Sequence, residues 1–502
     1  MDKKVRVRFA PSPTGGLHLG GVRTALFNYL FAKKNNGTFV LRVEDTDQSR
    51  FVEGAEEYIA DCLKWCGITP DESPVNPGIY GPYRQSERKP SYRKFAEQLV
   101  SDGYAYYAFD TPEELDAKRK DIPNFQYGQA TRMQMRNSLT LTLSEVEELL
   151  AAKTPHVVRI KVPENEVVHF KDLIRGDVSF DTSIVDDKVL LKADGMPTYH
   201  LAVVVDDKAM EISHAFRGEE WLPSAPVHIL LWKYLGWEAD MPVWGHLPLI
   251  LKPDGHGKLS KRDGDRLGFP VYAMNWADPK SGEVTKGFKE MGFIPEAFVN
   301  MLALLGWNDG TDQEIFSLKE LEEKFSIERI SKAGAKFDFE KAKWYNHEWI
   351  KVQSAEHLAP EVKAVLQKDG VQISDDYFLN TIIDLIKDRC TLMTDFAAQG
   401  GYFFNAPAEY DVNAVKPKWT AEKAAFFNEF AANLKLTDAA SEEASFKALA
   451  DEKGFKPGEL MLPFRIMLVG GKFGPGVFDI AVLLGVEETK SRIEKAIAVF
   501  NS

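Results

Sequence analysis

The chain of 502 residues has little cysteine, no long apolar run and no excess of basic residues. Its three cysteines, an odd number, give no disulfide framework. No apolar stretch approaches the roughly 20 residues that a membrane-spanning helix needs. The first residues are charged and lack the apolar core of a signal peptide. We therefore expect a cytoplasmic protein with reduced thiols and no membrane partner.

Two of the cysteines lie close together in the sequence. Cys62 and Cys66 fall on one face of a predicted helix, Glu53–Cys66, which Gly67 ends. Two ligands do not close a structural zinc site. We expect both to be thiols buried in a core.

The formal net charge of −13 argues at first against a nucleic-acid partner. The charge is uneven, however, because residues 1–50 carry nine Lys and Arg against four Asp and Glu. An acidic protein can still present a basic track, so net charge excludes no function class here. The length points to three or more domains.

A turn rich in proline and glycine separates a predicted strand from a predicted helix near the start of the chain. Apolar and basic residues alternate over Val5–Phe9, the period of a strand with one covered face. The turn is Pro11–Gly21, and apolar residues then recur at helical spacing at Val22, Leu26, Tyr29 and Leu30. Such a turn lets phosphate oxygens approach backbone N–H groups at a helix start. We interpret it as a nucleotide site in which His18 contacts a phosphate.

This turn matches neither of the two commonest phosphate-loop patterns, and a purely structural turn explains its glycines equally well. A second motif favours the nucleotide site. Lys258–Arg262 places three cations in five residues within a glycine-bracketed loop. Such a loop can neutralise a triphosphate or a phosphoryl transition state. Alone it would be a solvated basic loop, but the two motifs together indicate ATP chemistry.

The two motifs resemble the HIGH and KMSKS signatures of class I aminoacyl-tRNA synthetases, as His18–Gly21 and Lys258–Arg262. More narrowly, the chain resembles the bacterial glutamyl-tRNA synthetases. The matching segments follow in order as Phe9–Gly15, Arg42–Asp47, Gly81–Arg88, Pro197–His200 and Arg217–Trp221. The resemblance covers most of the chain and thins after about residue 350.

The resemblance and the order of predicted elements imply an α/β fold. We expect a Rossmann-like, doubly wound nucleotide-binding catalytic domain, split by an α+β insertion and followed by all-α anticodon-binding domains. The expected boundaries are 1–110 and 191–262 for the catalytic domain, 111–190 for the inserted acceptor-stem-binding domain, 263–335 for a helical stem-contact domain and 336–502 for the anticodon-binding region.

Several further elements are predicted from local patterns. Strands are expected at Thr38–Val43, His156–Val162, Val178–Leu191, Thr198–Val205 and near Val243–Leu251. Capping boxes that begin with Thr111 and Ser144 predict two helix starts. After Gly264 the chain is predicted to be chiefly helical.

The resemblance implies a glutamate–tRNA ligase. The α-carboxylate of L-glutamate attacks the α-phosphate of ATP and releases pyrophosphate, and glutamate then passes to the 3′-terminal adenosine of tRNA-Glu, leaving AMP. Positioning and charge stabilisation supply most of such a rate enhancement. We expect His18, Lys258 and Lys261 to be catalytic, with Mg²⁺ arriving alongside ATP. The residues expected to bind ATP are Pro11, Thr14, Gly15, His18, Gly20, Gly21, Lys258, Leu259, Ser260, Lys261 and Arg262.

A glutamate pocket needs a carboxylate for the ammonium group and guanidinium groups for the two carboxylates. By resemblance, Glu44 takes the α-amino group with help from Ser12. Arg8 and Arg217 take carboxylate oxygens, and Tyr199 orients the substrate. We expect Arg217 to select glutamate over glutamine, because an amide is a poorer partner for a charged fork.

The sequence departs from the family at two places. Many relatives carry a zinc knuckle of Cys and His in the insertion, but Tyr104–Asp110 and Tyr127–Met133 contain neither residue type. We therefore expect no zinc and no other protein-bound metal. Several relatives have Asn four residues after the pocket tyrosine, where this chain has Val203. One polar contact to the substrate is then missing or supplied elsewhere.

The C-terminal third is expected to read the anticodon. Arg389 matches a family position that contacts the third anticodon base, although short basic helices are mostly solvated faces. If the match is functional, the enzyme discriminates against tRNA-Gln. The family default is a monomer.

Other functions stay open from the sequence alone. The chain could be a non-discriminating or glutaminyl-type synthetase, or a relative that glutamylates a modified tRNA base. It could also be a tRNA-independent ligase or nucleotidyltransferase, or an RNA-binding protein without activity. Taken singly, each pocket arginine is as well explained as a surface cation, and the acidic run Glu44–Asp47 as a turn.

Overall fold

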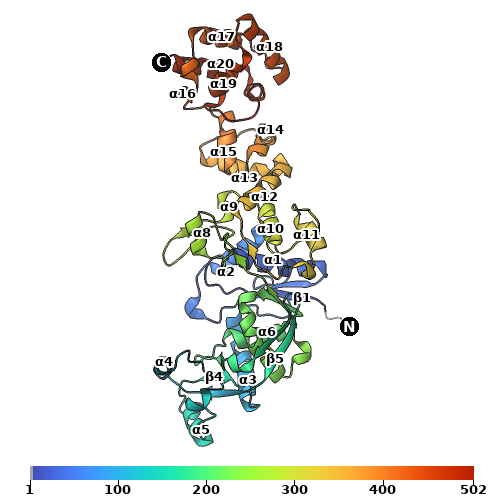
Figure 1. Ribbon diagram of the computed structural model, residues 1–502, viewed down its shortest axis with the longest axis vertical. Helices are drawn as coiled ribbons and strands as arrows, with labels where there is room; N and C mark the ends of the chain where they lie inside the picture. The colour runs from blue at the N-terminus through green and yellow to red at the C-terminus, as the bar shows by residue number, and fades with distance from the viewer. Residues whose placement is uncertain (1–3) are drawn as a thin grey trace. The chain divides into compact units, whose positions relative to one another are not determined.

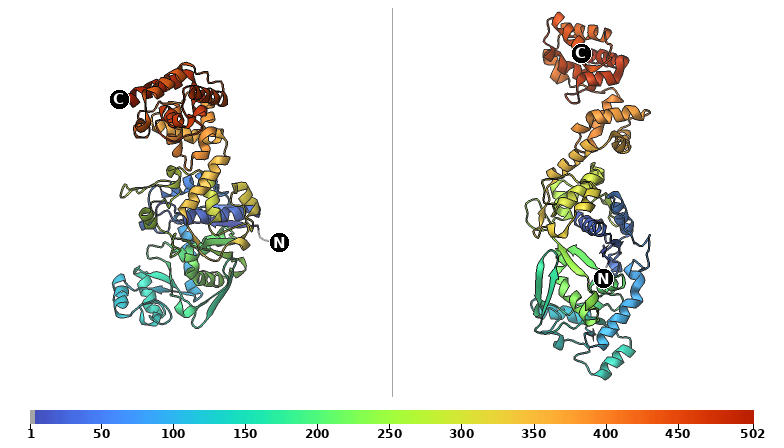
Figure 2. Two further views of the ribbon diagram at one scale, coloured as in Figure 1. Left: turned by 45° about the horizontal axis from the view of Figure 1, so that its top comes forward. Right: turned by 90° about the vertical axis from the view of Figure 1, so that its right-hand side faces the viewer.

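The structure, a computed structural model, describes residues 4–502, and these form two compact units. The first contains the residues up to Glu290 together with Pro295–Phe339, and the second contains Met291–Ile294 together with Glu340–Ser502. Figures 1 and 2 show strands and helices mixed in the first unit and helices alone in the second. The finer domain boundaries stay predictions.

The first unit opens with the expected β-α-β arrangement. Strand β1 (Arg6–Phe9) leads through α1 (Leu19–Lys34) to β2 (Thr38–Leu41), and the two strands pair in parallel. His18 is the N-cap residue of α1, so the helix starts earlier than the predicted position after Gly21. The start is earlier because the His18 side chain accepts a hydrogen bond from a backbone N–H of the first turn.

A second β-α-β arrangement lies beside the first. Strand β8 (His214–Gly218) leads through α7 (Ala225–Tyr234) to β9 (Val243–Leu247), again in parallel. The N–H of Ser213 donates to the carbonyl of Arg6 at 3.0 Å, which places β8 next to β1. The strand order β2-β1-β8-β9 therefore reverses direction between β1 and β8, and this confirms the doubly wound fold. Ligands bind such sheets where the order reverses, at the carboxyl ends of the strands.

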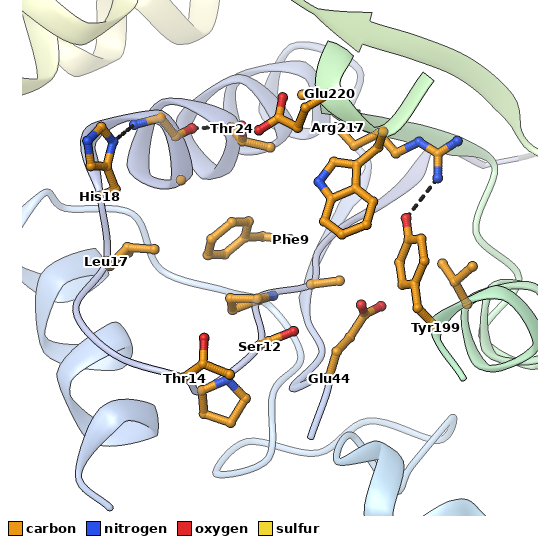
Figure 3. Close-up of a pocket in the computed structure, with 18 of the residues that line it drawn as sticks. Phe9, Ser12, Thr14, Leu17, His18, Thr24, Glu44, Tyr199, Arg217 and Glu220 are labelled. Carbon is orange, nitrogen blue, oxygen red and sulfur yellow. Dashed lines mark hydrogen bonds between the residues drawn. The ribbon is translucent and has the colours of Figure 1, made fainter. Parts of the chain in front are cut away.

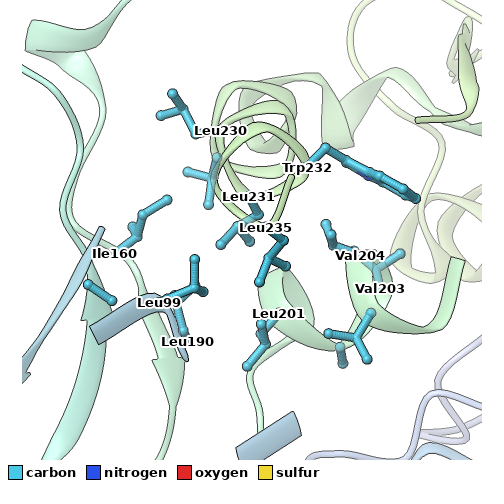
Figure 4. Packing of buried hydrophobic residues seen from close by; sticks show 14 of the residues in the cluster. Leu99, Ile160, Leu190, Leu201, Val203, Val204, Leu230, Leu231, Trp232 and Leu235 are labelled. Atoms are coloured by element: carbon cyan, nitrogen blue, oxygen red, sulfur yellow. The ribbon is translucent and has the colours of Figure 1, made fainter. Parts of the chain in front are cut away.

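A cluster of buried apolar residues joins three helices to strands of this sheet and of the insertion. The helices are α3 (Lys89–Ser101), α6 (Tyr199–Ala209) and α7. Figure 4 shows Leu99, Leu201 and Leu231, one from each helix, packed together in this cluster. Each fully buried leucine contributes about 1.5–3 kcal/mol relative to an exposed one.

The residues between the two halves of the sheet form the expected α+β insertion. Strands β3 (Ala105–Ala108), β4 (Val157–Ile160) and β7 (Val189–Leu191) make an antiparallel sheet. A hairpin of β5 (Val167–Asp172) and β6 (Gly176–Asp181) joins the edge of the other sheet, β2-β1-β8-β9, which we call the catalytic sheet. There Asp172 pairs in parallel with Trp244 of β9. The hairpin thus carries part of the insertion into the catalytic sheet.

Three predicted elements differ from the structure. The expected strand Thr198–Val205 is helix α6, because a continuous apolar run fits a buried helix as well as a buried strand. The expected strand Val178–Leu191 is interrupted after Asp181 by a short 3-10 turn, and β5 was not predicted. The helix expected to start at Ser144 is capped two residues earlier by Thr142, which exchanges hydrogen bonds with Glu145.

The remaining elements of the first unit are short. They are α2 (Ala55–Trp65), α4 (Pro112–Asp121), α5 (Leu143–Ala151), β10 (Ile250–Leu251), α8 (Lys261–Leu267), β11 (Trp276–Ala277), β12 (Val284–Thr285), α9 (Phe288–Met291), α10 (Pro295–Leu304), α11 (Leu318–Lys324) and β13 (Ala335–Lys336). Cys62 and Cys66, like Cys390, are buried free thiols, as predicted.

The second unit is helical throughout residues 340–502, all of which the structure describes. Its helices are α12 (Phe339–Val352), α13 (Ala355–Lys368), α14 (Asp376–Ile386), α15 (Asp395–Gly400), α16 (Val412–Val415), α17 (Ala421–Ala432), α18 (Ala439–Glu452), α19 (Pro457–Val469) and α20 (Val477–Asn501). The all-α prediction is confirmed. Across residues 4–502, no helix has both the length and the apolar character needed to cross a bilayer.

Candidate active site

A cavity of about 940 Å³ opens at the carboxyl ends of β1 and β8, where the strand order reverses. Most of the predicted site residues line it: Arg8, Pro11, Ser12, Thr14, His18, Gly20, Gly21, Glu44, Tyr199, Arg217, Lys258, Leu259 and Ser260. Gly15, Lys261 and Arg262 are not among its lining residues. Figure 3 shows His18 at one side of the cavity and Tyr199 and Arg217 at the other, with Glu44 between.

His18 is held in its neutral form. Burial lowers its pKa to about 4, and the positive charge of Lys258 contributes. Its Nδ1 accepts a hydrogen bond from the backbone N–H of Gly20 at 3.3 Å. Because Nδ1 accepts, the ring proton sits on Nε2. That atom is buried and has no hydrogen-bond partner among the described residues, and the His18 residue lines the cavity.

The basic loop contributes one lysine to the cavity as it stands. Lys258 lines the cavity, and its Nζ lies 2.6 Å from Oε1 of Glu220. Lys261 is the first residue of α8, and its Nζ is 3.7 Å from a carboxylate oxygen of Glu283. Ser260 and Asp263 form a capping box that fixes this helix start. Lys261 therefore lies in the first turn of α8, and its predicted role in the site stays a prediction.

The floor of the cavity is a buried chain of alternating charges. Arg8 donates to both carboxylate oxygens of Asp207, at 3.0 and 3.2 Å. Arg42 donates to Asp207 at 2.7 Å and to Oε1 of Glu44 at 3.0 Å. Burial would raise the pKa of Asp207, but the two arginines outweigh it and hold that pKa low. Asp207 therefore pairs with two guanidiniums at once, and the role of Arg8 towards a substrate carboxylate stays a prediction.

Arg217 is held quite differently. Its Nε donates to Nε2 of His246 at 2.9 Å, and its Nη1 donates to the hydroxyl of Tyr199 at 2.8 Å and contacts Nδ1 of His228 at 3.1 Å. The guanidinium lies 4.8 Å from the ring centre of Trp244. Nη2 is buried without a partner among the described residues. All these hydrogen-bond partners are neutral groups, so no carboxylate among the described residues pairs with the charge of Arg217.

The sequence did not reveal Asp207, His228 or His246, because no local motif contains them. Asp207 meets Arg8 across 199 residues of sequence, and His228 lies on α7. Val203, where relatives have Asn, lines the cavity with an apolar side chain. Arg389 lies in the second unit, in a 3-10 turn after α14, with an exposed side chain.

The described residues contain no group of three or more His, Cys, Asp or Glu side chains placed to hold a metal ion. Mg²⁺ commonly enters such sites on substrate phosphates, with only one or two carboxylates from the protein. The donor set of the cavity fits an ion carried in that way.

Family models match nearly all of the chain. Residues 4–344 match the catalytic domain of class I tRNA synthetases (E and Q), and residues 352–497 match an anticodon binding domain.

Curated relatives and solved structures agree with these matches. The chain is 54% identical to a glutamate–tRNA ligase of Phocaeicola vulgatus and 51% identical to one of Christiangramia forsetii, covering 99% of each chain. It superposes on the crystal structure of a glutamate tRNA ligase from Elizabethkingia meningosepticum in complex with its amino acid. That comparison has a TM-score of 0.94 and 48% identity, and covers 99% of this chain and 100% of the other. The chain therefore belongs to the class I aminoacyl-tRNA synthetases, in the family of the glutamate–tRNA ligases.

Proposed function

We propose that the cavity activates L-glutamate with ATP and passes it to tRNA-Glu, with the amino acid bound between Glu44 and Arg217. The observation that carries this assignment is the buried, partnerless Nη2 of Arg217. A dicarboxylic amino acid supplies the missing anion, whereas an amide leaves the charge unbalanced. Glu44 uses Oε1 for Arg42, which leaves Oε2 for the α-ammonium group. Ser12 lies at the same side of the cavity.

ATP occupies the other side of the cavity, as its Mg²⁺ complex. Its phosphates lie against Pro11–Gly21, where Nε2 of His18 donates to a phosphate oxygen. Lys258 exchanges Glu220 for a phosphate. Lys261 joins it only when the loop moves, and Gly255 and Gly257, both with positive φ, give that loop its freedom. The lysines then stabilise the charge that develops as pyrophosphate leaves.

The α-helical second unit reads the anticodon, and Arg389 contacts its third base. The exposed guanidinium of Arg389 is available for such a contact. We expect the enzyme, acting as a cytoplasmic monomer, to charge purified tRNA-Glu at least about tenfold faster than tRNA-Gln, since one lost base contact costs about 1–3 kcal/mol. Aminoacylation with labelled glutamate measures both rates. Equal rates on the two tRNAs would contradict the assignment of discrimination, and Arg389→Ala should narrow the difference.

The insertion holds its shape without zinc. One hydrogen bond joins the two segments where relatives carry zinc ligands, since Tyr127 donates to Asp110 at 2.8 Å. Within the second segment, the carbonyl of Arg132 accepts from Asn137 at 2.7 Å. We expect treatment with a zinc chelator, followed by dialysis into Mg²⁺ buffer, to leave charging activity and the melting temperature unchanged. Elemental analysis should find far less than one zinc per chain. A stoichiometric zinc content, or melting at a lower temperature after chelation, would refute this proposal.

A further inference from the structure

A chain of buried groups from the insertion and from α7 surrounds the guanidinium of Arg217. Behind it, His246 of β9 contacts Asp172, the last residue of β5, with 2.6 Å between Nδ1 and Oδ2. Beside it, Nε2 of His228 lies 3.3 Å from Nδ1 of His200. His228 and His246 are both 0% exposed, and Asp172 is 1% exposed. None of the three is among the residues that line the cavity.

An arginine can only donate hydrogen bonds, and this fixes the state of its neighbours. Nε2 of His246 and Nδ1 of His228 must both offer lone pairs to Arg217. Each imidazole is therefore neutral, with its proton on the other nitrogen. Burial, followed in effect by the charge of Arg217, keeps the pKa of His228 well below its usual range. Burial also lowers the pKa of His246, although the hydrogen bond to Asp172 opposes it.

The carboxylate of Asp172 fixes the tautomer of His246. Its Oδ1 accepts from the backbone N–H groups of Ile174 and Arg175, each at 2.9 Å. Its Oδ2 accepts from the backbone N–H of His246 at 3.1 Å and from the ring Nδ1–H. With Nδ1 protonated, Nε2 can only accept, and it accepts from Nε of Arg217. A carboxylate that orients a histidine in this way usually fixes its ring as well as its tautomer.

We propose that Asp172 and His246 are positioning residues for substrate selection. The neutral Nε2 of His246 orients Arg217 without pairing with the guanidinium charge. Nη2 of Arg217 can then bind the side-chain carboxylate of glutamate. A carboxylate in direct contact would have paired with Arg217, as Asp207 pairs with Arg8. Because the ring of His246 separates Asp172 from Arg217, the guanidinium keeps its orientation. Its positive charge then remains to pair with the substrate carboxylate. This inference rests on the proposed function.

The variant Asp172→Asn tests the tautomer. The oxygen of the new amide still accepts from the N–H groups of Ile174 and Arg175. Its NH₂ group then faces two donors of His246, the backbone N–H and the ring Nδ1–H. The ring must then move its proton to Nε2, where it opposes the N–H of Arg217. We expect KM for glutamate to rise about 10- to 100-fold, the effect of losing a hydrogen bond to a charged group. KM for ATP should stay within about twofold, and preference for glutamate over glutamine should fall by the same factor as kcat/KM.

A double-mutant cycle separates positioning from a loss of structure. His246→Gln keeps an acceptor near Nε2 but has no tautomer, so Asp172→Asn should have less than about a twofold further effect in that background. Asp177→Asn, an exposed carboxylate on the adjacent strand β6, is the matched control and should behave as the parent protein. Rates are measured by glutamate-dependent pyrophosphate exchange with tRNA-Glu present.

Each outcome has a distinct meaning. An unchanged KM for glutamate in Asp172→Asn, or equal effects of that change in both backgrounds, would overturn the positioning role and leave the proposed function intact. A parent protein with no glutamate-dependent exchange would overturn the proposed function, and this inference with it.

Discussion

Replacing Arg217 with glutamine is expected to lower kcat/KM for glutamate by about a thousandfold. Removing one partner of a buried, hydrogen-bonded charge pair costs about 2–5 kcal/mol, and each 1.36 kcal/mol is a factor of ten. Most of the loss should be in KM, because the carboxylate that Arg217 binds is distant from the reacting atoms. Arg217→Lys should fare little better, since an ammonium cannot satisfy His246, Tyr199 and His228 while still reaching the substrate.

The control for this prediction is Arg93→Gln, which changes an exposed arginine on α3 of the same unit. Initial rates of pyrophosphate exchange over a range of glutamate concentrations give kcat and KM separately. The activity with glutamine, which we expect to be low, should be nearly unchanged by Arg217→Gln. The ratio of kcat/KM for glutamate to kcat/KM for glutamine should therefore fall. A loss of less than about threefold with glutamate would show that Arg217 does not bind the side-chain carboxylate.

The second large effect is expected from His18→Asn. Asparagine caps α1 with its side-chain oxygen, as Nδ1 of His18 does, but has no donor at the position of Nε2. Removing one preorganised donor to a developing charge costs about 10²- to 10³-fold in kcat. The melting temperature and the affinity for tRNA-Glu should stay close to those of the parent protein, because the helix keeps its cap.

His169→Ala, an exposed histidine on β5, is the control for His18→Asn. Activation is followed by pyrophosphate exchange, and tRNA binding by filter retention or fluorescence anisotropy. Full exchange activity in His18→Asn would refute the role of Nε2, and an equal loss of tRNA affinity would show that the change disturbs more than activation.

The parts of the site that could be predicted from sequence are those fixed locally. The turn Pro11–Gly21 connects one strand to one helix, so its proline, glycine and histidine spacing is enough to predict a turn that lines the cavity there. The basic loop 258–262 is likewise a local cluster. The start of α8 at Lys261 was not predicted, although Ser260 and Asp263 form a capping box there.

The parts that could not be predicted depend on contacts between distant segments. Asp207 lies 165 residues from Arg42, and Asp172 lies 74 residues from His246. No periodicity or spacing links such residues, since the sheet order brings them together. The predicted strand Thr198–Val205 stopped short of Asp207, which lies on helix α6 and contacts Arg8. Composition and motifs therefore pointed to most of the residues that line the cavity but not to the buried groups that contact them.

The central claim, that this cavity activates glutamate for transfer to tRNA, is tested most directly by ATP–pyrophosphate exchange. Purified protein is assayed with glutamate or glutamine, each with and without tRNA-Glu. The resemblance to the glutamyl-tRNA synthetases implies that activation needs bound tRNA. We therefore predict rapid exchange with glutamate and tRNA-Glu together, and little with glutamine or without tRNA. Exchange that needs no tRNA, or that is as fast with glutamine as with glutamate, would contradict the claim that this cavity activates glutamate for transfer to tRNA.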